Sequence, residues 1–276
     1  MSAPDRPASA APTTASPTTA STGPASLTTA STGPASPTTA STGPASTGRV
    51  RATRRQGGPP PLVPALVYGA LLAGAVALLA GAPHPGSPAI STLSWARAHT
   101  GTLHAAALLI FGAATPLAIW TATIYRRLRT LGVTAPGAVI GLSGGLLASA
   151  SLALSGLVTW TLAETAPAVS PALAQVLTDL AFAAGAAGFV VPLALLLAGV
   201  AVPSLILRLT PPWLAWAGLV IAAIGAVSTF TLITPALDAT LPIGRFGGLA
   251  WIIAASLLLP ANRHQIRRAD QDRAAA

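Results

Sequence analysis

Residues 180–207 read LAFAAGAAGFVVPLALLLAGVAVPSLIL and contain no Asp, Glu, Lys or Arg. A helix needs about 20 consecutive apolar residues to cross a hydrocarbon core about 30 Å thick. Residues 62–82, 130–163 and 209–237 are equally free of charged side chains. A soluble core could not bury this much apolar surface. The pattern therefore predicts an all-α, polytopic membrane helical bundle.

The composition agrees with a membrane protein. Hydrophobic residues make up 52 % of the chain and charged residues 8 %, whereas soluble domains carry about 25 % charged residues. All 15 basic residues are arginines, and the net charge is +9. A basic chain can bind nucleic acid, but these arginines cluster just outside the apolar stretches. We therefore expect the lipid bilayer and anionic lipid headgroups as partners, and no nucleic acid.

The chain divides by composition into three parts. Residues 1–60 form a low-complexity tail in which the decamer SPTTASTGPA of residues 16–25 recurs, with one change, at 26–35 and again at 36–45. The repeat offers no apolar face to bury, so we expect this tail to be disordered. Residues 61–262 form the transmembrane domain, and residues 263–276 form a basic tail.

Six transmembrane helices are expected, near residues 62–81, 103–124, 138–160, 171–207, 214–233 and 243–259. Residues 80–82 (AGA) resemble a signal-peptidase site, but the first apolar stretch is too long and too far from the start for a signal peptide. The fourth stretch exceeds one crossing. Either its first turns form an extension at the outer surface or the whole helix tilts. Ser170 followed by Pro171 is typical of a helix start.

The arginines also predict the orientation. Cytoplasmic loops of membrane proteins carry an excess of basic residues. With both termini in the cytoplasm, every arginine except Arg97 and Arg245 lies on the cytoplasmic side. We therefore expect a multi-pass protein of the plasma membrane with both termini cytoplasmic.

Small residues and prolines within the spans predict how the helices pack. Gly141, Gly145 and Ser149 recur every four residues, a spacing that lets helices approach closely in lipid. Pro116 and Pro192 lie inside the second and fourth spans, where a freed carbonyl can mark a kink. Broken helices in transporters use the same feature, so both interpretations stay open.

No catalytic, metal or cofactor site is expected. Residues 141–145 (GLSGG) match a nucleophile pattern, but such an elbow needs a strand-to-helix turn and a nearby base. His99 and His104 lie at the opposite face of the membrane from Ser143. These two histidines are five residues apart, so they project from different helix faces and cannot chelate one metal as an i, i+4 pair would.

The best candidate site is a cluster of polar groups at the outer face. Arg245 lies inside the sixth span, so it must snorkel to the surface or pair with an acid. Asp238 is the nearest acid in sequence, and Asp179 is the other candidate. We expect a structural ion pair here, or alternatively a small polar pocket. The cluster comprises Arg97, His99, His104, Glu164, Asp179, Asp238 and Arg245.

Three segments resemble a known group of proteins. These are residues 192–199 (PLALLLAG), 209–218 (LTPPWLAWAG) and 241–251 (LPIGRFGGLAW). They resemble six-span integral membrane proteins of high-GC Gram-positive, actinobacterial-type bacteria. That family has no established activity, so the resemblance implies a fold and a source and no mechanism.

Two functions are consistent with the sequence. The first is a non-enzymatic membrane protein with a regulatory, scaffolding or envelope-related role, because no span centre carries an acid. The second is a small secondary transporter or channel-like protein with a polar vestibule at the outer face. A cavity that reaches the middle of the bilayer would favour the second, and a dry bundle with paired outer charges the first.

Overall fold

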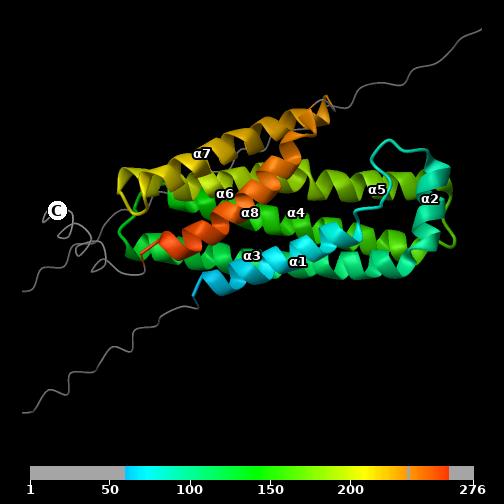
Figure 1. Ribbon diagram of the computed structural model, residues 1–276, viewed down its shortest axis with the longest axis horizontal. Coiled ribbons are helices and arrows are strands. Elements are labelled where there is room, and N and C mark those ends of the chain that lie inside the picture. Colours follow the sequence, from blue (N-terminus) through cyan, green and yellow to red (C-terminus); the bar gives the residue numbers. More distant parts are fainter. Residues whose placement is uncertain (1–59, 235–236, 261–276) are drawn as a thin grey trace, which may run out of the picture. The chain divides into compact units, whose positions relative to one another are not determined.

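The computed structural model describes residues 60–234 and 237–260, all within one compact unit of the chain. The repeat tail ahead of Pro60 and the basic tail at 263–276 lie outside the described residues. The helices, of which α1–α8 are labelled in Figure 1, are α1 (Leu62–Leu78), α2 (Ala89–Ala98), α3 (Thr100–Thr130), α4 (Gly137–Thr165), α5 (Pro171–Gly185), α6 (Ala187–Ile206), α7 (Pro212–Val227), the 3-10 helix η1 (Ser228–Leu232) and α8 (Thr240–Leu258).

The predicted all-α, polytopic membrane fold is confirmed. Helix α1 is apolar, but its 17 residues fall just short of the length that a crossing helix needs. Helix α1 packs against α3, which does reach that length. The sixth predicted crossing therefore depends on whether α1 crosses as well. Five helical stretches are long and apolar enough to cross a membrane, namely Thr100–Thr130, Gly137–Thr165, Pro171–Ile206, Pro212–Leu232 and Thr240–Leu258.

Short-range signals set several helix ends. The Leu173 amide donates to Ser170 Oγ at 3.4 Å, and Pro171 is the first residue of α5, which confirms the predicted start. Helix α7 also begins with a proline, Pro212, but without a side-chain cap. The turn after α3 contains Gly132 at φ +93°, a conformation that glycine adopts without strain.

Helix α2 was missed by the sequence interpretation. Its ten residues are too few to cross a membrane and include several polar side chains, so no apolar stretch indicated it. The helix lies across one end of the bundle, against α5 and the first turns of α3 (Figure 1). Leu93 and Ala96 pack there against Leu103 and Leu162 in a small separate core. This end of the bundle is called the α2 end below.

The long fourth stretch is interrupted between α5 and α6. The sequence suggested a single helix that extends or tilts, but the backbone leaves the helical region at Ala186, with φ −95° and ψ −100°. By contrast, α6 continues through Pro192 without a break in the helix. Helix α6 alone is about 30 Å long, which matches the hydrocarbon core. Helix α5 is therefore a separate half-helix at the α2 end.

Close approach between α4 and α6 forms the centre of the bundle. A Cβ added at Gly144 would lie 2.6 Å from the backbone nitrogen of Leu196, and one at Gly141 would lie 3.4 Å from the Gly199 carbonyl carbon. The predicted Gly141–Gly145 spacing thus faces α6 and α3, because Gly145 packs on Thr121. Large side chains such as Trp120 are fully buried in the surrounding core.

Candidate functional site

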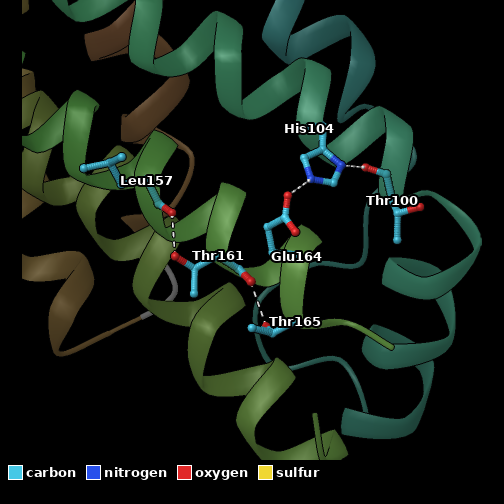
Figure 2. A network of polar contacts seen from close by, with 6 residues as sticks. All are labelled: Thr100, His104, Leu157, Thr161, Glu164 and Thr165. Carbon is cyan, nitrogen blue, oxygen red and sulfur yellow. Dashed lines mark hydrogen bonds and ion pairs between the residues drawn. The ribbon is translucent and has the colours of Figure 1, made fainter. Parts of the chain in front are cut away.

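Two members of the predicted polar cluster form an ion pair at the α2 end. His104 Nε2 on α3 and Glu164 Oε1 on α4 are 2.9 Å apart, and His104 Nδ1 lies 2.9 Å from the Thr100 carbonyl (Figure 2). Both side chains are about half exposed, at 40 % and 52 %. An exposed pair of this kind contributes little to stability; it joins the start of α3 to the end of α4.

Two further members hold the backbone at this end. Arg97 Nε donates to the Ala166 carbonyl at 2.9 Å, and its Nη2 donates to the Pro167 carbonyl at 3.4 Å, so the side chain of α2 secures the turn after α4. His99 stacks on the Trp95 ring, with a 4.7 Å separation between ring centroids. These contacts are structural, since Arg97 donates to backbone carbonyls and His99 packs on a neighbouring ring of the same helix region.

The expected ion pair of Arg245 does not form. Within residues 60–234 and 237–260, the Arg245 guanidinium donates to the Gly185 carbonyl and lies over the Phe189 ring, 5.7 Å from its centroid. Asp179 and Asp238 make no ion pair with it in this part of the chain. The physical reason is the break at Ala186, which presents the carbonyl end of α5 to the cation. The negative end of a helix dipole attracts positive charge.

Tyr68 is a second polar group beside Arg245. Its side chain is fully buried in the centre of α1, and its hydroxyl has no hydrogen-bond partner among the described residues. The phenol lies close enough to Arg245 to interact with it electrostatically. Buried polar groups are nearly always hydrogen-bonded, and an exception calls for an explanation. Two buried donors with spare capacity therefore lie within electrostatic range of each other.

Arg245 lines a pocket of about 380 Å³, called the Arg245 pocket below. Gly185, the last residue before the break, and the α4 residues Leu152 and Ser155 line it near the arginine. The loop after α1 covers the other side, where His84 and Pro85 are exposed to the surroundings. The lining comprises Leu72, Ala75, Val76, Leu79, Ala80, Ala82, Pro83, His84, Pro85, Trp95, Leu103, Ile110, Leu152, Ser155, Thr159, Leu162, Thr178, Ala181, Phe182, Gly185 and Arg245.

The other half of the bundle is packed around large buried side chains. The Trp120 indole donates to Ser256 Oγ at 2.7 Å and joins α3 to α8. Leu117, Leu193 and Ile252 are buried around it. At the far end, Arg127 Nη1 donates to the Leu259 carbonyl at 3.0 Å. The pocket thus ends at Arg245, and a close-packed core lies beyond it.

The structure separates the predicted cluster into two places. Arg245 opens into the pocket, whereas Arg97, Glu164, Asp179 and Asp238 are not among the residues that line it. His104 instead lines a shallow groove of about 320 Å³ between α3 and α4, with Phe111 and Trp160. Within the described ranges, no group of three or more His, Cys, Asp or Glu side chains comes close enough to hold a metal ion.

No family model, curated protein or solved structure matches the chain. The resemblance to actinobacterial-type membrane proteins therefore stays a prediction, and the function must be argued from the residues.

The sequence interpretation missed most of the Arg245 pocket. Tyr68 offered one signal, because it is the single tyrosine in the first apolar stretch. Gly185 and Ser155 offered none, since each looks like an ordinary small residue of a packed membrane helix. Their role appears only when α4, α5 and α8 are brought together.

Proposed function

We propose that this multi-pass membrane protein is a non-enzymatic binding protein that holds one small, largely apolar molecule in the Arg245 pocket. The observation that carries the proposal is the pocket itself. Its volume of about 380 Å³ lies within the 300–1,000 Å³ range of small-molecule sites, which are mostly apolar with a few polar groups. A regulatory or envelope-related role fits a protein that binds such a molecule and carries out no reaction on it.

The arginines support an outward-facing pocket. Arg126, Arg127 and Arg129 end α3, and Arg208 follows α6, so these four lie away from the α2 end. By the positive-inside rule, the opposite end of the bundle, which carries these four arginines, faces the cytoplasm. The α2 end and the opening at His84 and Pro85 would then face the outside, where the pocket can take up molecules from the surroundings or from the outer leaflet.

The break between α5 and α6 favours a second candidate, a small transporter. Transporters bind their substrates at interrupted helices, where unpaired backbone groups face the site. Here the break at Ala186 lies beside the pocket and presents the Gly185 carbonyl to Arg245. The close-packed core beyond Arg245 argues for binding without transport. Uptake of the bound molecule into vesicles that carry the protein would decide for the transporter.

A photoreactive neutral probe tests the binding function. We expect a long-chain alcohol carrying a diazirine to label segments 76–85 and 178–185 saturably, with the full-length protein in lipid nanodiscs and the labelled peptides identified by mass spectrometry. Ala181→Phe places a ring in the pocket wall and should weaken this labelling about tenfold.

The matched control is Ala172→Phe on the same helix. Ala172 is exposed and does not line the pocket, so this variant should label like the unaltered protein. Equal labelling of Ala181→Phe and the unaltered protein, or labelling that never saturates, would show that the pocket is not a binding site.

A further inference from the structure

We infer that the ligand of the Arg245 pocket is an anion with an apolar chain, namely a carboxylate or a phosphate monoester whose acidic group binds Arg245. This inference rests on the proposed binding function and adds the charge class of the ligand to it.

The charge of Arg245 is the first argument. The pocket lining contains one arginine and no Asp or Glu. The nearest acids make no ion pair with Arg245, and Glu164 is paired with His104. A charged side chain within a membrane helix is costly unless it pairs, and it marks a functional site by default. An anion bound at Arg245 would supply the missing countercharge.

The unused donors of Arg245 are the second argument. A guanidinium carries five N–H donors in a planar fork that fits the two oxygens of a carboxylate or phosphate. In the described chain the Gly185 carbonyl accepts from Nη2, and the Phe189 ring lies against the guanidinium. Capping α5 accounts for that one donor. The other donors have capacity for a ligand.

The Tyr68 hydroxyl is the third argument and is independent of the arginine. It comes from α1, where it is fully buried and does not itself line the pocket, and it has no partner in the described part of the chain. An acidic group held by Arg245 would provide an acceptor for this hydroxyl. A purely structural arginine would explain neither the unpartnered phenol nor the adjoining pocket.

The lining predicts the rest of the ligand. Leu72, Val76, Leu103, Leu162 and Phe182 line the pocket between Arg245 and the loop after α1. An apolar chain attached to the bound acid would contact these side chains and end near Trp95. A small hydrophilic anion would leave this surface uncovered and would gain nothing from it.

A matched ligand series tests the charge class without any substitution. Dodecanoate, dodecyl phosphate, dodecanol and dodecylammonium share one chain and differ in the head group, and they would compete with the diazirine alcohol on the full-length protein in phosphatidylcholine nanodiscs. We expect the two anions to compete at concentrations about tenfold lower than dodecanol, and dodecylammonium to compete least.

Two results of this series would overturn the inference. Equal competition by dodecanoate and dodecanol would remove the role of the charge and leave the binding function in place. Competition by acetate or inorganic phosphate as strong as that of the long-chain anions would show a site for small anions. If no member of the series reduces the labelling and the labelling does not saturate, the binding function itself fails.

Variants assign the effect to the two side chains. Arg245→Gln should weaken competition by dodecanoate about tenfold and change competition by dodecanol less than about twofold. Arg245→Lys should recover part of the loss. Tyr68→Phe should weaken competition by dodecanoate about threefold, because it removes the hydroxyl that donates to the bound acid. Arg97→Gln is the control, because the hydrogen bonds of Arg97 within the described residues all go to the turn after α4. A preference for anions that survives in Arg245→Gln would overturn the assignment to Arg245.

Discussion

Most hydroxyl groups in the spans bond to the helix that carries them. Ser149 Oγ donates to the Gly145 carbonyl at 2.9 Å and Thr159 Oγ1 to the Ser155 carbonyl at 2.8 Å, four residues earlier in each case. Fewer polar side chains bond between helices. One is the Trp120 indole, which donates to Ser256 Oγ across the interface of α3 and α8. Only bonds of this second kind link one helix to another.

The difference predicts unequal effects for two serine substitutions. Ser256→Ala leaves the buried Trp120 N–H without its acceptor, and we expect it to lower the stability of the purified protein by about 1 kcal/mol, within the range of such bonds in membranes. Ser149→Ala removes a hydroxyl whose acceptor already takes part in its own helix, so its effect should be smaller. Thermal unfolding in mild detergent measures both. Equal melting temperatures for the Ser256→Ala and Ser149→Ala variants would show that the bond between α3 and α8 contributes nothing.

At the level of helices, small residues decide which surfaces meet. Gly144 on α4 faces the backbone of α6 so closely that a Cβ would lie 2.7 Å from the Pro192 carbonyl oxygen. Gly112 on α3 is also a mid-helix glycine, but its nearest neighbour would be a Leu71 methyl group at 3.7 Å, an ordinary contact. The two glycines look alike in the sequence and differ only in what packs against them.

Alanine substitutions should therefore act in opposite directions. Gly144→Ala must push α6 away and should destabilise the protein by about 1–3 kcal/mol. Gly112→Ala meets no obstacle and removes a flexible residue from a helix, so it should be neutral or stabilising by about 0.5–1 kcal/mol. Unfolding in mild detergent again measures the difference. Destabilisation by Gly112→Ala as large as that by Gly144→Ala would contradict the packing of α4 against α6.

At the level of the whole molecule, the topology depends on whether α1 crosses the membrane. Its 17 residues reach about 25 Å, slightly less than the hydrocarbon core. The helix runs antiparallel to α3, since Leu71 approaches Gly112 while Leu109 approaches Gly74. Local thinning of the bilayer can accommodate a short span at modest cost. We therefore expect α1 to cross, which puts the N-terminal tail and the loop after α3 on one side.

Single-cysteine labelling in intact cells tests this topology, because the chain contains no cysteine of its own. With both termini in the cytoplasm, Ser46→Cys in the tail and Thr134→Cys after α3 should be protected from an impermeant thiol reagent. Ala168→Cys after α4 and Ser87→Cys after α1 should react. Labelling of Ser46→Cys together with protection of Thr134→Cys would show that α1 does not cross, and the fully reversed pattern would invert the predicted orientation.

Local sequence signals account for the features that were predicted well. Uninterrupted apolar length indicates a membrane helix whatever its neighbours are, so the spans that begin near Leu103 and Ala138 could be recognised without a structure. The cap formed by Ser170 and Pro171 is equally local, because donor and acceptor are three residues apart. The distribution of arginines predicts the orientation on the same principle, and labelling will decide it.

The sequence by itself determined that this chain is an all-helical membrane protein and where most of its helices run. The tertiary structure alone decided the partner of Arg245. In sequence its nearest acid is Asp238, yet its hydrogen-bond acceptor is the Gly185 carbonyl. That carbonyl faces the arginine because the helix breaks at Ala186, where α4 and α8 pack against the chain. Apolar length is a property of one segment, whereas a pocket depends on several segments that meet only in the fold.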